Sequence, residues 1–503
     1  MGGKDACKCG IGGIYYCGSG AFLISFEREM NKFTRRFFLE GCASLGALAG
    51  GRVLAAPSVT LPKPRLKFGV LSDVHVRDDK QCDSTTLKRA FAYFRDNGAD
   101  AVLIAGDIAD QGYVSQLKYA ADAWYSVFPG DKAPDGRHVE KLFVYGNHDI
   151  DGWRWGRKKE QLEDPKVLAD AIGASEEKIA RTWEECFHEK FEPVWIKDVK
   201  GYKFIGCHWG HFDKVEAFVK SHAAELKGPK PFFYTQHPHP KDTCMGTWAW
   251  GHDAGQSTRA LSAFPNSVAF SGHSHYTLTD ERTVWQGSFT SINTSSLRYT
   301  SLDYNFRENA PGNSGGYRLW KPSGDTPRFG TGEGRQGMLV EVGDGALVIH
   351  RIEFVWGESL GDDWVVPVPA AAGGPLDFAK RAAKRKAPVF EESARAKAAV
   401  ESGKDGVKFV SVSFPAAKSV DKCRVFEYEV SANILEDDVD MAVAVRRVLA
   451  PDFFLPDSKC GRSGLCRFRL SDLPQKAALR FEVRPVECFG LKGRPIFSDV
   501  FRT

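Results

Sequence analysis

Five short polar motifs between residues 73 and 275 contain side chains that are suited to metal chemistry. They are Asp73-Val74-His75, Gly106-Asp107, Gly146-Asn147-His148-Asp149, Gln236-His237 and Gly272-His273-Ser274-His275. Carboxylate, amide and imidazole groups in this mixture suit Zn, Mn, Fe or Ni better than Mg or Ca. Because no cysteine belongs to the set, the motifs do not indicate an iron–sulfur centre.

The chemistry that such a set predicts is that of a metal pair. One carboxylate shared between two ions, with about three further ligands for each, holds the ions ~3.5–4 Å apart. Such a pair clamps a phosphoryl group, lowers the pKa of a bridging water and stabilises charge on the attacking and leaving oxygens. A single Asp-x-His is commonly a loop, and a single strand-end histidine is commonly a core residue. Five such elements in order, each after a strand, are much less expected by chance.

Alternating strands and helices must position these motifs. Apolar runs predict strands at 66–71, 101–105, 141–145, 202–206, 231–235 and 267–270. Helical spacing follows at 84–97, again up to about 127, and in a longer charged segment at 158–190. This alternation favours a layered α/β fold, in which ligands bind in the crevice at the carboxyl ends of the strands. Each motif follows such a strand, usually beside a glycine that lets the backbone turn sharply.

The ordered motifs resemble those of the calcineurin-like metallophosphoesterase superfamily over about residues 66–300. The resemblance implies a four-layer α/β/β/α sandwich that carries a dinuclear site. It implies a first metal held by Asp73, His75 and His275, a bridging Asp107, and a second metal held by Asn147, His237 and His273. It also implies that His148 contacts the phosphate and protonates the leaving oxygen, which suits an imidazole near neutral pH.

The residues after Asp107 depart from two branches of that superfamily. Purple acid phosphatases carry a metal-binding tyrosine three residues after the bridging aspartate, whereas this chain has Asp110. A coloured iron–tyrosinate site is therefore not expected. Serine/threonine protein phosphatases have Asp followed by Arg-Gly, but here Gln111-Gly112 follows, which argues against protein phosphatase activity. Two interpretations of Asp110 remain: it orients His148 as part of the catalytic set, or it is a loop or helix-capping residue.

Other residues near the predicted crevice are weaker candidates. The segment Trp153-Arg154-Trp155-Gly156-Arg157 could grip a phosphorylated or base-containing substrate, or pack as a lid. Further candidates for substrate contact or support are His208, His211, His239, Trp248, Trp250 and His252. Residues of these types in loops more commonly have no special role.

The N-terminus predicts export. Arg35-Arg36-Phe37 is followed by an apolar run of small residues, and Val53-Leu54-Ala55 offers a cleavage site near Ala55-Ala56. A charged segment, then an apolar run, then a cleavage site with small residues is the order found in signal peptides. Together with the paired arginines, it indicates a signal peptide of twin-arginine type within residues 1–55. The alternative is a short amphipathic helix. Because Met30 is a natural start, residues 1–29 are interpreted as an upstream extension, and the mature chain is expected in the periplasm or cell envelope.

The C-terminal part has a different pattern. Two apolar runs around Gly343-Asp344-Gly345 predict a hairpin that completes the first domain. We therefore expect a phosphoesterase domain at 56–366, a Pro/Ala/Gly-rich linker at 367–387, and an all-β sandwich at 388–503. The sandwich weakly resembles fibronectin type III. Such modules serve as spacers or adhesion units, so its expected partner is the cell surface or a glycan.

Composition limits the remaining alternatives. The chain has 503 residues, a formal charge of +4, much of it before residue 56, and 12 cysteines, none in a CxxC pair. A near-neutral body does not favour nucleic acid as a partner, which counts against a metal-dependent nuclease. Cys460 and Cys466 flank a short loop and could be bridged, although buried free thiols are the commoner case.

The sequence thus predicts an exported hydrolase of a small-molecule or envelope-derived phosphate mono- or diester. It would act by attack of a metal-bound hydroxide, with two transition metal ions (Mn, Fe, Zn or Ni) as cofactors. An envelope binding or adhesion protein with a degenerate phosphoesterase domain is the other alternative, and the complete ligand set argues against it.

Overall fold

The structure is a computed structural model. It describes residues 64–77, 81–244, 253–300 and 334–503, except residues 372, 404, 405, 422, 437 and 438. The predicted signal peptide and upstream extension lie outside these residues, as do Trp248, Trp250 and His252. Among the described residues, none of the helices combines the length and apolar character needed to cross a membrane.

The first of two central sheets contains the strands that precede Asp73, Asp107 and Asn147. Its strand order is β12-β11-β10-β1-β2-β3, with β13 beside β11. The bounds are β1 Leu66–Leu71, β2 Ala101–Ala105, β3 Glu140–Val144, β10 Gln336–Val342, β11 Ala346–Glu353, β12 Glu358–Ser359 and β13 Trp364–Pro367. Strands β1, β2 and β3 are parallel, and β1 also pairs antiparallel with β10. The predicted hairpin is β10–β11, and it extends this sheet.

The second sheet contains the strands that precede His237 and His273. Its order is β4-β5-β6-β7-β9-β8. The bounds are β4 Val194–Val199, β5 Tyr202–Cys207, β6 Phe232–Thr235, β7 Ser267–Ser271, β8 Val284–Gln286 and β9 Thr290–Asn293. Strands β5, β6, β7 and β9 run parallel. Both sheets therefore have a parallel centre, whose strands end at one edge.

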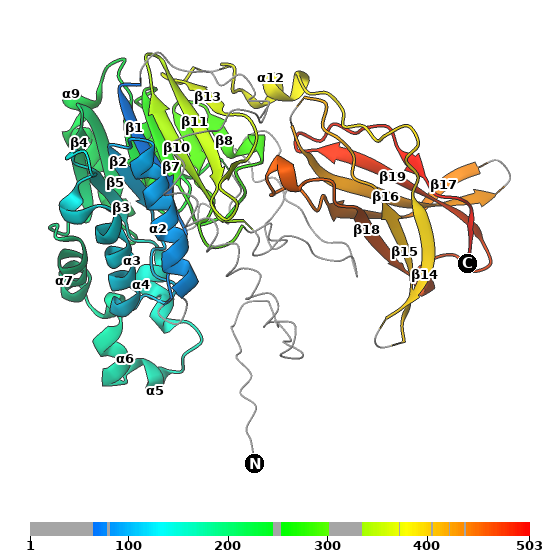
Figure 1. The fold of residues 1–503 in the computed structure, drawn as a ribbon, viewed down its shortest axis with the longest axis horizontal. Helices are drawn as coiled ribbons and strands as arrows, with labels where there is room; N and C mark the ends of the chain where they lie inside the picture. The colour runs from blue at the N-terminus through cyan, green and yellow to red at the C-terminus, as the bar shows by residue number, and fades with distance from the viewer. Residues whose placement is uncertain are drawn as a thin grey trace, which may run out of the picture. The chain divides into compact units, whose positions relative to one another are not determined.

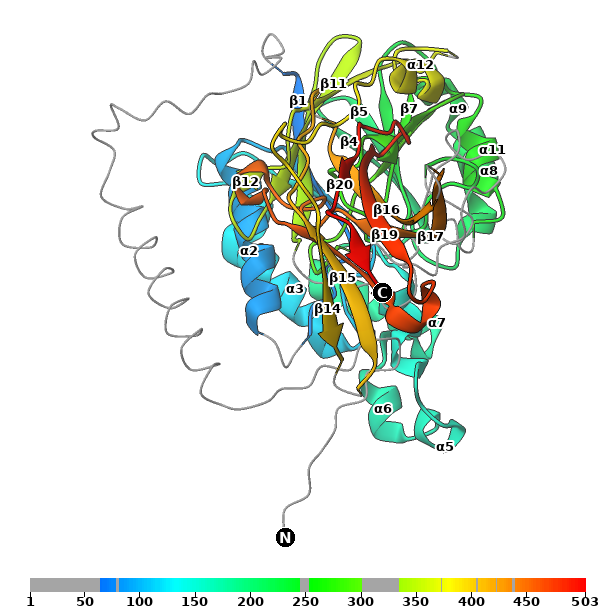
Figure 2. The same cartoon turned by 90° about the vertical axis from the view of Figure 1, so that its right-hand side faces the viewer.

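Apolar side chains hold the two sheets face to face. The Phe68 ring of β1 packs edge-on against Phe204, Phe233 and Phe270 of the second sheet, with ring centroids 5.2, 4.9 and 5.7 Å away. Helices α2 (Gln81–Asp96), α3 (Val114–Val127) and α7 (Glu176–Phe187) cover the outer face of the first sheet. Helices α8 (Val215–Ser221), α9 (Ala223–Leu226) and α11 (Gln256–Leu261) cover the second (Figure 2). The predicted α/β/β/α layering is confirmed.

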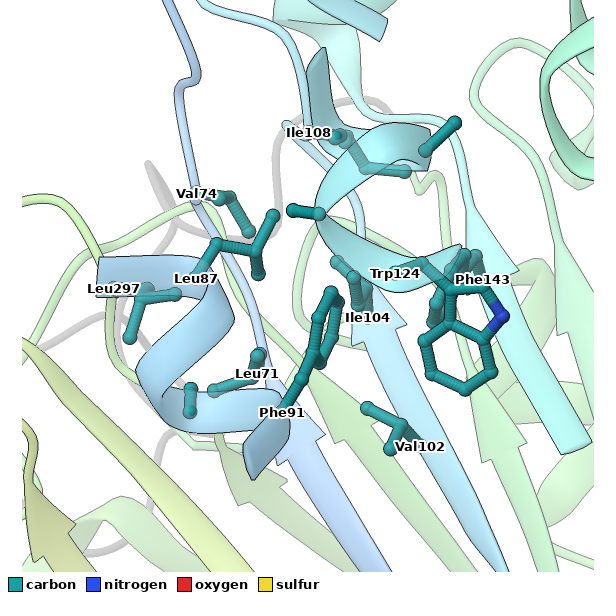
Figure 3. Close-up of a cluster of buried hydrophobic side chains, with 14 of the residues drawn as sticks. Leu71, Val74, Leu87, Phe91, Val102, Ile104, Ile108, Trp124, Phe143 and Leu297 are labelled. Atoms are coloured by element: carbon teal, nitrogen blue, oxygen red, sulfur yellow. The ribbon is translucent and has the colours of Figure 1, made fainter. Parts of the chain in front are cut away.

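The helices on the first sheet are fixed by large side chains. Phe91 of α2 packs against Trp124 of α3 at 5.2 Å, and Trp124 packs against Phe143 of β3 at 5.4 Å (Figure 3). These rings lie over Val102 and Ile104 of β2. Burial of this many aromatic groups anchors the strands whose ends carry the polar motifs.

The predicted helical segment at 158–190 is three helices. They are α5 Lys159–Leu162, α6 Pro165–Asp170 and α7 Glu176–Phe187, and α4 (Asn147–Asp151) precedes them. The breaks follow from local chemistry: Asp164 caps α6 ahead of Pro165, and Ser175 caps α7. Proline without an N–H is tolerated at a first turn but not inside a helix.

The C-terminal part consists of two antiparallel sheets, as predicted (Figure 1). One has the order β14-β15-β18, and the other has β17-β16-β19-β20 with β21 beside β19. The bounds are β14 Lys397–Ser402, β15 Lys408–Phe414, β16 Val425–Glu436, β17 Val439–Leu449, β18 Gly464–Arg469, β19 Ala478–Glu487, β20 Ile496–Phe497 and β21 Phe501–Arg502. Phe468 and Phe481 join the sheets at a ring distance of 5.5 Å.

The structure adds two details to the sequence-based interpretation of this region. The segment interpreted as a linker contains a short helix, α12 (Phe378–Ala383), which Asp377 caps through the Lys380 N–H. Cys460 and Cys466 are free thiols and are not bridged, with Cys460 exposed and Cys466 buried.

Candidate metal centre

The carboxyl ends of the central strands bring the five polar motifs together. Asp73 and His75 follow β1, Asp107 follows β2, and Asn147 and His148 begin the helix α4 that follows β3. From the second sheet, His237 follows β6, and His273 and His275 follow β7. Because the parallel strands of both sheets end at the same edge, these residues converge, although up to two hundred residues separate them along the chain.

The backbone at these positions is unusual. Asp73, His75, Asp107, His273 and His275 all have φ between 47° and 70°, in the left-handed region. They make up five of the eleven non-glycine residues with positive φ among those the structure describes. Such conformations are disfavoured for residues with a Cβ and cluster at functional sites, where the surrounding packing holds them. The surrounding fold therefore holds a strained backbone that aims these side chains.

Glycines let neighbouring backbone approach the ligand side chains closely. A Cβ at Gly146 would lie 2.2 Å from Asp107 Oδ1, and one at Gly272 would lie 2.3 Å from Asp73 Oδ2. A Cβ at Gly106 would lie 2.6 Å from His237 Nδ1. Each distance is far inside van der Waals contact, so the glycines that precede the motifs leave room for the carboxylates and the imidazole.

Replacement of Gly146 by alanine is expected to weaken metal binding by about 10- to 100-fold, because the new methyl group must push Asp107 aside. Metal titration followed by calorimetry measures this affinity. Melting in the presence of a chelator serves as the control, since it reports folding without metal. Unchanged metal affinity in a variant whose metal-free melting is also unchanged would contradict this account of Gly146.

The first group of converging atoms surrounds one oxygen of Asp73. Asp73 Oδ1 lies 2.9 Å from His275 Nε2 and 3.8 Å from His75 Nε2, and the two imidazole nitrogens are 3.0 Å apart. The other oxygen, Oδ2, accepts hydrogen bonds from Ser72 Oγ at 2.6 Å and from the His273 N–H at 3.0 Å. One carboxylate oxygen is thus held by the protein, and the other faces the histidines.

The second group surrounds one oxygen of Asp107. Asp107 Oδ2 lies 3.0 Å from His237 Nε2 and 3.7 Å from His75 Nε2, which belongs to the first group. The imidazoles of His237 and His273 approach to 3.1 Å. Asp107 Oδ1 accepts the His148 N–H at 2.9 Å. Asp107 Oδ2 therefore lies between both groups, as a bridging ligand requires, and it is nearer to His237 than Asp73 Oδ1, which lies 3.9 Å away.

Asn147 supplies the strongest single sign that the groups hold cations. Its side-chain oxygen Oδ1 is buried and has no hydrogen-bond partner among the described residues. A buried acceptor without a donor costs free energy unless something else satisfies it. A metal ion satisfies such an oxygen, and the nearby donor set of carboxylates and imidazoles suits transition metals.

Outer hydrogen bonds leave the inner nitrogens of the histidines available. His237 Nδ1 lies 2.7 Å from the Ala105 carbonyl oxygen, and His275 Nδ1 lies 3.1 Å from that of Tyr299. Donation of the Nδ1 proton to these carbonyls leaves Nε2 unprotonated in the neutral ring. This is the usual arrangement around metal-binding histidines.

Asp110 contributes to the site in a way that the sequence did not predict. Its carboxylate oxygen Oδ1 lies 3.2 Å from His75 Nδ1, and its backbone carbonyl accepts a hydrogen bond from His148 Nδ1 at 2.6 Å. Asp110 therefore contacts both histidines, but it is the backbone that contacts His148, and the carboxylate is directed at His75.

Replacement of Asp110 by asparagine is expected to lower metal affinity and hydrolysis by about 10- to 100-fold, because His75 loses the carboxylate that orients its ring. Asp135→Asn, at an exposed aspartate, is the control and should match the parent chain. Steady-state kinetics at several metal concentrations separates the two effects. Equal metal affinity and activity in both variants would remove Asp110 from the site.

Charge is concentrated in this cluster. Burial would raise the pKa of the Asp73 and Asp107 carboxyls, but the facing imidazoles hold both pKa values well below the ordinary one. Burial opposes the charged form of His75, yet the carboxylates of Asp110 and Asp73 raise its pKa to about 10. The same carboxylates that attract protons onto these histidines would attract metal cations, and the two compete.

Two neighbours in the Asn147 motif have different environments. Burial lowers the pKa of His148 to about 4. Burial and the nearby Asp107 raise the pKa of Asp149 to about 7. Asp149 accepts backbone N–H groups of Ile108, Ala109 and Gly146, so its carboxyl joins the loops after β2 and β3.

The weaker candidates divide into core and surface residues. His208 accepts the Tyr145 N–H and packs among Trp183 and Phe191. His239 is buried between the hydroxyls of Ser271 and Ser274. Both are therefore structural. His211 is half-buried and precedes the short helix Phe212–Lys214, whereas Arg154 is exposed and contacts Asp151 and the Gly173 carbonyl.

Several residues near the cluster were missed by the sequence analysis. The Tyr299 ring lies 4.4 Å from that of His275, and Arg298 donates to the His75 carbonyl at 3.1 Å. The Trp209 ring lies 6.1 Å from that of His237 and 6.0 Å from that of His273. Trp155, identified only as part of a lid or substrate segment, packs against His148 at 4.4 Å. No local motif marks these residues, because each reaches the site through the fold.

Comparison with known proteins gives the class. Residues 66–277 match the family model described as calcineurin-like phosphoesterase, so the chain contains a domain of this family. The matched segment includes every predicted metal ligand. None of the curated proteins compared matches the sequence.

Several solved structures match the chain at low similarity. A dimetal phosphatase from Danio rerio has 9% identity and a TM-score of 0.32, and the match covers 60% of this chain and 99% of that chain. The purple acid phosphatase PPD1 of yellow lupin has 12% identity and a TM-score of 0.35, covering 61% and 55%. GAP50 of Plasmodium, described as the anchor in the inner membrane complex, has 9% identity and a TM-score of 0.35, covering 61% and 89%. At such values these likenesses do not bear on activity.

Proposed function

We propose that this chain is an exported phosphoesterase that hydrolyses a phosphate mono- or diester at a dinuclear metal site. The observation that carries the proposal is the position of Asp107 Oδ2, which lies between the His75 and His237 imidazoles. The unsatisfied Asn147 oxygen supports it. The proposed ligands are Asp73, His75 and His275 for one ion, Asn147, His237 and His273 for the other, and Asp107 for both.

The chain's own residues would orient the ester and move one proton. When bound, a metal pair supplies an activated water nucleophile and neutralises charge on the phosphoryl oxygens. His148 Nδ1 donates to the Asp110 carbonyl, so its Nε2, 4.0 Å from Asp107 Oδ2, faces the cluster. The negative charge of a bound phosphate offsets the burial that disfavours protonated His148. Nε2 can then pass a proton to the leaving oxygen.

An assay of the purified mature chain tests the proposed activity. Panels of phosphate monoesters and diesters would be offered with Mn, Zn or Fe supplied, and phosphate release or alcohol release measured. We expect hydrolysis that requires a transition metal and stops after chelation. A folded, metal-supplemented chain that hydrolyses no ester in either panel would contradict the proposal and favour a binding role.

Export is proposed from the order of features at the N-terminus. Replacement of both Arg35 and Arg36 by lysine keeps the charge but removes the paired guanidinium groups that the twin-arginine class requires. We expect the double variant to accumulate as uncleaved precursor, whereas the parent chain yields a mature form beginning near Ala56. Equal export of both chains would show that the segment is not a twin-arginine signal.

A further inference from the structure

Two exposed aromatic side chains lie at the ends of a row of histidines in the metal centre. In order, the rings are those of Trp155, His148, His75, His275 and Tyr299. Successive ring centroids are 4.4, 4.3, 4.9 and 4.4 Å apart. Trp155 meets His148 edge-on at 86°, and Tyr299 lies tilted at 46° to His275.

The exposure of these two rings is unusual in this chain. Only three aromatic side chains of the described residues count among the exposed large hydrophobic groups: Tyr119 at 45%, Trp155 at 47% and Tyr299 at 37%. Two of the three contact histidines of the metal centre. Aromatic groups left open to solvent beside converging polar groups are typical of ligand sites.

Each ring contacts a histidine that a backbone carbonyl orients. The Tyr299 carbonyl accepts the hydrogen bond from His275 Nδ1 at 3.1 Å, so residue 299 orients His275 through its backbone and contacts it through its ring. Trp155 packs against His148, which the Asp110 carbonyl fixes. The positions of the two rings relative to the cluster are therefore defined by the site itself.

We propose that Trp155, the ring packed on His148, forms a subsite for a ring-bearing leaving group of the phosphate ester. This inference rests on the proposed function. With phosphorus at the cluster, the leaving oxygen faces His148, and the group attached to it extends to the exposed ring packed on His148. In the reaction the P–O bond to this group breaks, a water oxygen bonds to phosphorus, and the released alcohol carries the proton.

Two substrates with equally acidic alcohols isolate the effect of the ring. With the metal-loaded full-length mature chain, kcat/KM would be measured for phenethyl phosphate and for butyl phosphate, and the first value divided by the second. Since an aromatic contact contributes a several-fold effect, we expect a ratio of about five or more for the parent chain. Trp155→Leu should lower this ratio severalfold, mainly through weaker binding of the phenethyl ester. Trp155→Phe keeps a ring and should keep most of the ratio, and Tyr299→Leu, at the far end of the row, should leave the ratio unchanged.

Tyr119→Leu is the matched control, because it removes an equally exposed tyrosine from helix α3. Its ratio should equal that of the parent chain. A parent ratio near one, or a Trp155→Leu variant that keeps the parent ratio, would overturn the subsite while leaving the phosphoesterase intact. If the metal-loaded chain hydrolyses neither of these esters nor any ester of the two panels, the proposed function fails and the subsite fails with it; if it hydrolyses other esters but not these two, only the subsite is overturned.

A separate observation concerns two cysteines in the C-terminal β-sandwich. Cys423 precedes β16 and Cys488 follows β19, next to the paired positions Val425 and Glu487. Both thiols are buried, with Sγ atoms 3.2 Å apart, and Cys423 Sγ–H donates to the Glu487 carboxylate at 3.2 Å. An S–S bond of ~2.05 Å needs an approach of only about 1 Å.

We infer that Cys423 and Cys488 form a disulfide when a small-molecule disulfide such as oxidised glutathione is present. One S–S bond forms, the two thiols lose two protons and two electrons, and the oxidant is reduced to two thiols.

Peptide mapping of the full chain without reduction should show the 423–488 link, and reduction should lower the melting temperature by about 10 °C. Cys423→Ser should melt at that lower temperature in both states, while Cys186→Ala should keep the shift. Alkylation of both thiols in denaturant after the oxidant treatment would overturn the link.

Discussion

Replacement of Asp107 by asparagine is expected to lower kcat/KM by roughly 1,000-fold and to reduce metal content below two ions per chain. Asp107 Oδ2 lies close to histidines of both groups, 3.7 Å from His75 and 3.0 Å from His237, whereas Asp73 Oδ1 lies 2.9 Å from His275 but 3.9 Å from His237. Asparagine has almost the same shape but lacks the negative charge that two adjacent cations need. Metal analysis and kinetics on the same preparation measure both effects.

Asp100→Asn is the matched control for this prediction. Asp100 is as buried as an aspartate of the site, but it lies before β2, at the opposite end of the strand from Asp107, and pairs with Lys200 at 2.7 Å. The control should keep its metals and its activity per folded molecule even where it loses stability. An Asp107→Asn variant that keeps two metal ions and parent activity would show that the bridge is elsewhere.

Replacement of His148 by asparagine is expected to lower hydrolysis of an alkyl phosphate by about 10²- to 10⁴-fold without removing the metals. An alkoxide leaves poorly without a proton, and His148 Nε2 is the proposed donor. A nitrophenolate needs no proton to leave, so the loss with a 4-nitrophenyl ester should be about tenfold smaller or less.

The contrast between leaving groups identifies the role of His148. His138→Asn, at an exposed histidine that contacts Glu140, is the surface control and should behave as the parent chain. Equal losses for the alkyl and nitrophenyl esters would mean that His148 binds the phosphate but does not protonate the leaving group. Loss of metal in the variant would instead place it among the ligands.

Much of the fold was predictable because its signals are local. The strand run at 101–105 is apolar over its whole length, and the run at 66–71 is apolar except for Lys67, as is typical of buried parallel strands; the structure places β2 and β1 at these positions. The hairpin was predictable because Gly343-Asp344-Gly345, which lies between its two strands, consists of residues that favour a tight turn. The segment at 158–190 is helical as predicted, but its division into three helices was not predicted; Asp164 and Ser175 cap the second and third of them.

The site was predictable to the extent that its residues follow strands. Convergence of Asp73, Asp107 and His237 follows from parallel strands that end at one edge, before any distance is known. The sequence does not predict which histidine the Asp110 carboxylate contacts. Asp110 lies three residues after Asp107, and from there its carboxylate can reach either His75 or His148. Trp155 and Tyr299 reach the histidines from loops, where spacing carries no information on direction.

Stepwise metal loading tests the central claim most directly. Metal-free mature protein would be titrated with Mn²⁺ or Zn²⁺ while bound metal and phosphate ester hydrolysis are measured on the same samples. The dinuclear site predicts that activity rises with added metal and reaches its maximum at two ions per chain. A folded chain that binds no metal, or that is fully active with one ion or none, would contradict the assignment of Asp107 as the bridge between two metals.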